Sequence, residues 1–153
     1  MTEPTRTQGG QLLTDLMLDL FRLHGRVIAS GDRLVADLGL TSARWQVLGA
    51  IAAAQRPQPV AWLARDLGAN RQNIQRIVND LEAAGLVAFA PNPHHRRAQL
   101  VVLTEEGRAA FEAAMRLQAP WVERLAEGLA VEELQTVHRV LVDLRLKLEG
   151  DGA

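Results

Sequence analysis

A stretch in the middle of the chain is rich in amide and guanidinium side chains. These side chains belong to Arg71, Gln72, Asn73, Gln75, Arg76 and Asn79. Arginine makes bidentate hydrogen bonds to guanine, and asparagine or glutamine to adenine, at the base edges exposed in the DNA major groove. An ordinary hydrated helix face would normally carry more lysine and glutamate. The stretch therefore indicates a surface that reads base pairs.

A second group of polar side chains is basic and follows closely. It consists of His94, His95, Arg96 and Arg97. Pro91 and Pro93 stiffen the segment before it, so its cations are presented where they can meet phosphates or enter a minor groove. The formal net charge of the chain is -1, yet arginines outnumber acids between residues 65 and 97, and DNA responds to the local patch. We expect double-stranded DNA as the partner.

Other interpretations of these residues remain open. Arg76 can instead pair with Asp80 four residues later, leaving the amides merely hydrated. His94 and His95 suggest a metal, but neighbouring hairpin residues point to opposite sides and no third ligand is apparent. The chain has no cysteine, which excludes thiolate zinc sites and thiol redox sensing. We predict no enzyme activity, no cofactor and no metal.

Helical periodicity predicts the direction in which the amide and arginine side chains of this stretch point. If Ile74 marks a buried helix face, at about 100° per residue the other apolar positions of this stretch lie beside it. Gln72, Arg76 and Asn79 then point away from the core, with Asn73 and Gln75 flanking them. The pattern predicts one apolar face and one face of amides and arginine.

The polar stretch lies in the last of three predicted helices, and a predicted hairpin follows it. The helices are Leu40–Ala54, Val60–Leu67 and Asn70–Ala84. A turn at Gly68 joins the last two, as a helix-turn-helix requires, and Asn70 is a good N-cap. Two short apolar runs, 86–89 and 100–103, predict a β-hairpin with the basic segment at its tip. Residues 40–103 are therefore expected to form a DNA-binding lobe.

Longer helices flank this lobe. Apolar residues recur every three or four positions within 11–30 and again within 104–149, where Pro120 predicts a break or kink. Each such stripe of apolar residues, which we call a seam, can pack on the lobe or pair with a second copy of the chain. We predict a homodimer. Residues 1–10 are expected to be disordered. Because neither a membrane-spanning run nor a signal peptide is apparent, we expect a cytoplasmic protein without membrane contact.

The order of these pieces resembles the MarR family of bacterial transcription regulators. The matching segments are Leu40–Leu48, Leu63–Gly68, Arg76–Val87 and the wing exit from Arg97 to Thr104, with Gly107. The resemblance implies a mainly α fold with a small β-hairpin wing, a winged helix-turn-helix with N- and C-terminal dimerisation helices. It further implies recognition helices in successive major grooves and wings in the adjacent minor grooves.

One position departs from the family pattern. Arg97 occupies the place of the family's wing arginine, but His95 stands two residues earlier, where aspartate is usual. A neutral histidine can still accept a hydrogen bond from the arginine, whereas a protonated one repels it. The salt link that normally orients this arginine is therefore not expected.

The predicted function is sequence-specific DNA binding by a transcription regulator. The resemblance implies a repressor on an inverted-repeat operator, released by a small amphipathic or aromatic effector. The alternative is a winged-helix module that binds protein without binding DNA. Salt-dependent binding to random duplex separates the two possibilities.

Overall fold

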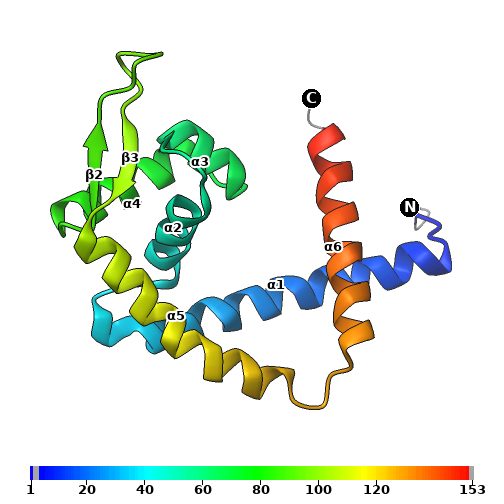
Figure 1. Ribbon diagram of the computed structural model, residues 1–153. Coiled ribbons are helices and arrows are strands. Elements are labelled where there is room, and N and C mark those ends of the chain that lie inside the picture. Colours follow the sequence, from blue (N-terminus) through cyan, green and yellow to red (C-terminus); the bar gives the residue numbers. More distant parts are fainter. Residues whose placement is uncertain (2–3, 152–153) are drawn as a thin grey trace. The chain divides into compact units, whose positions relative to one another are not determined.

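The protein is mainly helical, and its computed structural model describes residue 1 and residues 4–151 (Figure 1). The elements are α1 Gln8–Val35, the 3-10 helix η1 Ala36–Leu38, α2 Ser42–Ala53, β1 Gln58–Pro59, α3 Val60–Asp66, α4 Arg71–Ala83, β2 Val87–Ala90, β3 Leu100–Leu103, α5 Glu105–Ala126 and α6 Val131–Asp151. The chain divides into two compact units, Met1–Gln118 and Ala119–Ala153. Long helices and one small sheet confirm the predicted fold class.

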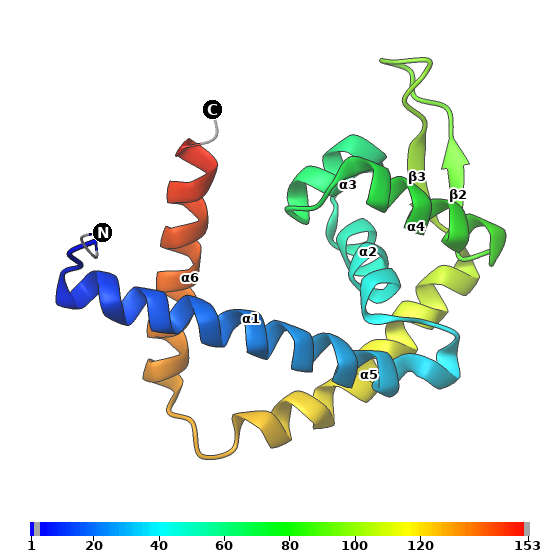
Figure 2. The ribbon, with the colours of Figure 1, turned by 180° about the vertical axis from the view of Figure 1, so that it is seen from behind.

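The hydrophobic core of the first unit lies among α2, α3, α4 and the sheet (Figure 1). Its most deeply buried side chains include Leu48, Leu63, Val78, Val87 and Val101, each at most 2% exposed. The opposite view shows α3, α4 and the β2–β3 hairpin side by side (Figure 2). Packing against this common core fixes the relative positions of the two helices and the hairpin.

The turn between α3 and α4 has the predicted chemistry. Gly68 adopts a φ of +61°, a left-handed conformation in which a Cβ atom would be strained. The side-chain oxygen of Asn70 then caps α4 by accepting hydrogen bonds from the backbone N–H groups of Gln72, at 2.8 Å, and Asn73, at 3.3 Å. The helix-turn-helix prediction is confirmed at both of its signals.

The sheet has three antiparallel strands in the order β1-β3-β2. In the predicted hairpin, Phe89 lies opposite Val101. Strand β1 was not predicted and places Gln58 beside the same valine. Two residues are too few to show a strand periodicity, and proline, which has no N–H to donate, is normally a strand breaker.

The first helix is longer at both ends than its sequence pattern predicts. It begins at Gln8, so the expected disorder of residues 1–10 is wrong for the last three of them, while residues 2 and 3 lie outside the described part of the chain. The Thr7 hydroxyl oxygen caps the helix by accepting a hydrogen bond from the N–H of Gly10 at 3.1 Å. The helix continues past residue 30 to Val35, which is fully buried in the core.

The C-terminal segment also differs in detail from the expectation. Helix α5 runs through Pro120, so of the predicted break or kink the break is wrong. A proline removes one hydrogen bond, but the turns on either side can still form. Helix α6 extends to Asp151, two residues beyond the predicted end at 149. Among the described residues, no helix combines the length and the apolar character needed to cross a bilayer.

A close contact joins α1 to α2. The Ser42 side chain is buried, and its hydroxyl donates a hydrogen bond to the carbonyl oxygen of Ile28 at 2.8 Å. The backbone N–H of the same serine donates to Oδ1 of Asp32 at 2.7 Å. A Cβ atom on Gly31 would lie 2.4 Å from the serine oxygen. Only glycine leaves room for the serine hydroxyl and its hydrogen bond to Ile28.

This contact makes a stability prediction. We expect Gly31→Ala to destabilise the protein by about 1–3 kcal/mol, because the new methyl group overpacks the joint. Ser42→Ala removes the clashing oxygen, so the double variant should lose less than the sum of the two single variants. Thermal or urea unfolding of the four proteins measures this coupling, and simple additivity would contradict it.

Candidate nucleic-acid interface

Helix α4 has one apolar face and one polar face, as its spacing predicts. The apolar face consists of Ile74, Ile77, Val78 and Leu81, none of them more than 6% exposed. On the other side Gln72, Arg76 and Asn79 are exposed. Burial of the apolar face thus sets the rotation of the helix about its axis, and the rotation decides which side chains a partner meets.

The polar side chains of α4 are organised in two pairs. The Arg76 guanidinium donates a hydrogen bond from Nη2 to Oδ1 of Asn73 at 2.8 Å. Nε2 of Gln75 donates to Oδ1 of Asn79 at 3.0 Å. Each pair holds its members in place, yet these bonds leave the remaining guanidinium N–H groups and the two asparagine NH2 groups unused. The surface therefore keeps hydrogen-bonding capacity for base edges.

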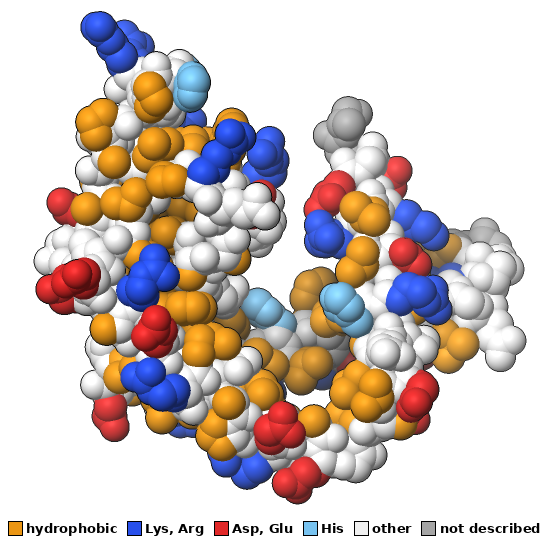
Figure 3. All heavy atoms as spheres, in the orientation of Figure 1, with side chains coloured by type: hydrophobic (Ala, Val, Ile, Leu, Met, Phe, Trp, Pro, Cys, Tyr) orange, Lys and Arg blue, Asp and Glu red, His pale blue; other side chains and the backbone are white. Residues whose placement is uncertain are grey.

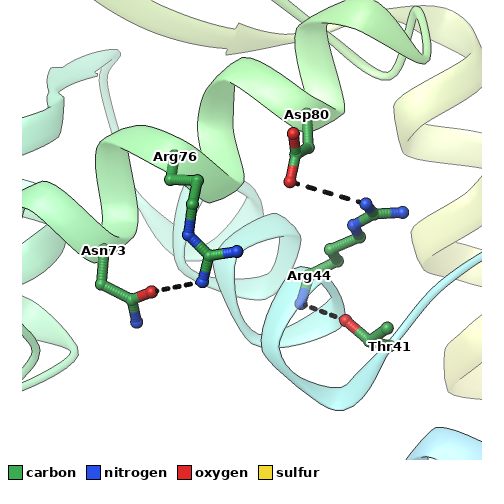
Figure 4. Close-up of polar contacts among 5 residues, drawn as sticks. All are labelled: Thr41, Arg44, Asn73, Arg76 and Asp80. Atoms are coloured by element: carbon green, nitrogen blue, oxygen red, sulfur yellow. Dashed lines mark hydrogen bonds and ion pairs between the residues drawn. The ribbon is translucent and has the colours of Figure 1, made fainter.

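Asp80 is engaged by another helix. Its carboxylate lies 3.6 Å from Nη2 of Arg44 on α2, while Arg76 is directed toward Asn73 (Figure 4). The expected alternative, an ion pair between Arg76 and Asp80, is therefore wrong. Arg44 is itself positioned at the start of α2, where its backbone N–H donates to the capping hydroxyl of Thr41. The link from α2 leaves the positive charge of Arg76 available.

The N-terminal end of α4 also favours an anion. Arg71 is the first residue of the helix and is exposed. The positive end of the helix dipole lies at the same place, where the Asn70 side chain already accepts hydrogen bonds from the N–H groups of Gln72 and Asn73. Arg71 is thus suited to a DNA phosphate, whereas the outer side chains further along α4 are suited to base edges.

The four basic residues predicted at the hairpin tip, His94 to Arg97, are all exposed. Figure 3 shows arginine and histidine side chains gathered at the free end of the hairpin. Within the part of the chain that the structure describes, no carboxylate pairs with Arg96 or Arg97. This agrees with the loss of the usual aspartate at His95. The tip keeps its full positive charge.

Thr104 ties the base of the hairpin to the residues that follow α4, and its hydroxyl also accepts a hydrogen bond from the N–H of Gly107 at the start of α5. Its hydroxyl donates to the carbonyl oxygen of Gly85 at 2.6 Å, and its N–H donates to that of Leu86 at 3.1 Å. A Cβ on Gly107 would come within 1.8 Å of the Leu86 oxygen, so glycine is required there. No pattern in the sequence signals this link between helix and hairpin.

A metal at the histidines gains no support from the geometry. Over the described residues there is no group of three or more histidine, cysteine or acidic side chains placed to hold an ion.

A helix-turn-helix with a polar outer face, followed by a hairpin with a basic tip, defines the class of winged helix-turn-helix proteins.

Comparison with known proteins identifies the family within this class. The model of the MarR family matches residues 38–98. A protein of Mycobacterium tuberculosis with no assigned function is 37% identical, covering 85% of this chain and 92% of its own. The transcriptional activatory protein BadR of Rhodopseudomonas palustris is 32% identical over 94% of this chain and 85% of its own. The multiple antibiotic resistance protein MarR of Escherichia coli is 32% identical over 82% and 90%. The chain belongs to the MarR family, whose members are transcription regulators and not enzymes.

Solved structures agree with this assignment. The transcriptional repressor CouR bound to a 23-mer DNA duplex superposes with a TM-score of 0.77 at 27% identity, covering 92% of this chain and 99% of its own. CouR from Rhodococcus jostii bound to p-coumaroyl-CoA gives a TM-score of 0.76 at 25% identity, covering 85% and 91%. The likeness therefore extends from the central lobe to the flanking helices.

The exposed side chains of α4 lead to a prediction about recognition of the DNA sequence. We expect Arg76→Ala to weaken binding to the specific site by about 1–3 kcal/mol, and to weaken binding to random duplex less, because a base contact is lost. Arg76→Lys keeps the charge without the bidentate fork and should lose specificity almost as fully. Lys147→Ala, which removes a cation from α6, is the control. Equal weakening on both duplexes in a fluorescence anisotropy titration would make Arg76 a phosphate contact.

Proposed function

We propose that this protein binds an inverted-repeat operator in double-stranded DNA as a homodimer and represses transcription until a small effector releases it. The observation that carries the proposal is the outer face of α4, where an arginine and hydrogen-bonded amides lie opposite a buried apolar face. Such side chains match the donors and acceptors of base edges in the major groove.

The proposed DNA contacts come from two elements of the lobe. They are Arg71, Gln72, Asn73, Gln75, Arg76 and Asn79 of α4, and His94, His95, Arg96 and Arg97 of the hairpin. In this proposal α4 enters the major groove, while the hairpin tip reaches backbone phosphates or the neighbouring minor groove. The ties of Thr104 to Gly85 and Leu86 support a fixed spacing between the two contacts.

Uncovered apolar side chains on the flanking helices support a homodimer through residues 11–30 and 104–149. On α1, the seam residues Leu16, Leu20, Leu23 and Val27 are each at least 39% exposed. On α6, Leu134, Val137 and Leu148 are at least 44% exposed. Covering these side chains with a second copy of the chain buries apolar area and gives two copies of α4 related by a two-fold axis. A two-fold protein requires an inverted repeat in the DNA.

Repression and effector release rest on the chemistry of the related complexes. A dimer that covers a promoter excludes the polymerase, which makes repression the direct outcome of operator binding. CouR, bound in separate structures to DNA and to p-coumaroyl-CoA, supports a small aromatic or amphipathic effector for this chain as well. A regulator must share a compartment with the DNA that it binds, which supports a cytoplasmic location.

Binding to the DNA immediately upstream of the protein's own coding sequence tests this function. We expect an inverted repeat there to bind at least about a thousandfold more tightly than random duplex at equal salt. A reporter behind this DNA should be repressed by the protein and restored by an aromatic acid or its thioester. Absence of salt-dependent binding to either duplex would favour the alternative, a module that binds protein.

The homodimer makes a separate prediction. We expect Leu141→Asp or Leu144→Asp to give monomer or aggregate in analytical ultracentrifugation and to abolish operator binding, because a charge would be buried in an apolar seam. Gln135→Asp adds the same charge on the opposite side of α6 and should remain dimeric. An unchanged dimer in both leucine variants would remove α6 from the interface.

A further inference from the structure

The tip of the hairpin is built from two consecutive turns. The backbone N–H of His95 donates to the carbonyl oxygen of Asn92 at 3.3 Å, and the N–H of Ala98 donates to that of His95 at 3.2 Å. Each bond joins a residue to the third residue after it, which is the pattern of a β-turn. Arg96 and Arg97 are the two central residues of the second turn, so its geometry sets the direction of both side chains.

The side chain of Asn92 braces both turns. Its Oδ1 accepts a hydrogen bond from the N–H of His94 at 3.0 Å, which closes the first turn locally. Its Nδ2 donates to the carbonyl oxygen of Ala98 at 2.9 Å, the last residue of the second turn. One half-buried amide thus connects the beginning and the end of the loop that carries all four basic side chains.

We propose that Asn92 is the positioning residue that prepares Arg96 and Arg97 for DNA, an inference that rests on the proposed function. A loop held only by backbone turns would have to be ordered when it meets DNA, and that ordering would weaken binding. Two hydrogen bonds from one rigid side chain remove part of this cost before the DNA arrives.

An uncharged amide such as that of Asn92 can order a loop whose arginines have no acidic partner. A carboxylate that orients an arginine also neutralises it, whereas an amide is uncharged and can donate and accept at once. With histidine at position 95 and no acidic partner among the described residues, the tip relies on Asn92 for its shape and keeps two full arginine charges per subunit. Binding should therefore depend strongly on salt.

The test compares Asn92→Ala and Asn92→Ser with the wild-type full-length protein. Serine keeps an acceptor for the His94 N–H but is too short to reach Ala98, so it isolates the bond across the tip. We expect both variants to bind operator and random duplex about tenfold more weakly. The slope of log affinity against log salt should fall by about two for the loss of one phosphate contact from each of the dimer's two wings, since each contact contributes about 0.9. Melting temperatures should stay near wild type, because the core is untouched.

A double-mutant cycle shows whether Asn92 acts through the arginines. In a background of Arg96→Ala with Arg97→Ala, Asn92→Ala should have no further effect on affinity or salt slope. Gln99→Ala removes an exposed amide just beyond the tip and serves as the matched control, with wild-type salt dependence expected.

Two outcomes would overturn the proposal, and they can be told apart. If the double arginine variant binds DNA with wild-type affinity and salt slope, the wing does not contact DNA, and both the inference and that part of the proposed function fail. If the double arginine variant weakens binding but Asn92→Ala leaves affinity and slope unchanged, or if the effects add, the inference alone fails.

Discussion

Burial of the apolar face of α4 is the constraint on which the rest of this protein depends. Val78 and Leu81 lie in the core with almost no exposed surface, packed with Leu48 of α2 and Leu63 of α3. Removing these side chains from water stabilises the lobe and also forbids rotation of the helix about its axis. The outer face of α4 follows from this packing, so a change in the core is also a change in the surface offered to DNA.

Polar links then connect α4 to the elements around it. Asp80 pairs with Arg44 of α2, and α2 is joined to α1 through the two hydrogen bonds of Ser42. These links contribute differently to the stability of the fold. The ion pair is more than a third exposed, so water and salt weaken it, whereas the serine is buried and would leave unsatisfied groups if its partners were lost. The α1–α2 contact is therefore the firmer of the two connections.

The distribution of charge explains how a slightly acidic protein can bind DNA. The formal net charge is -1, but Arg71, Arg76, Arg96 and Arg97 are exposed on the helix-turn-helix and its wing. Several of the acids are engaged in ion pairs on the flanking helices, including Asp143 with Arg139 and Glu149 with Arg145. Local positive potential near α4 and the hairpin is what a phosphate backbone would meet.

The sequence alone determined the local elements of this protein and the faces of its helices. Asn70 marks a helix start, Gly68 marks the turn before it, and the spacing around Ile74 separates the apolar from the polar side of α4. These features depend on neighbours within one or two turns, so they can be read along the chain.

Contacts between distant segments were decided by the tertiary structure. Four features depend on contacts between separate elements. They are the pairing of Arg44 with Asp80, the extension of α1 to Val35, the strand at Gln58 and the hydrogen bonds of Thr104. Helical spacing left a pairing of Arg76 with Asp80 open, because the sequence shows only the side chains on the same helix. Which partner an ionic or polar group finds depends on the packing of the core, and that packing exists only once the chain has folded.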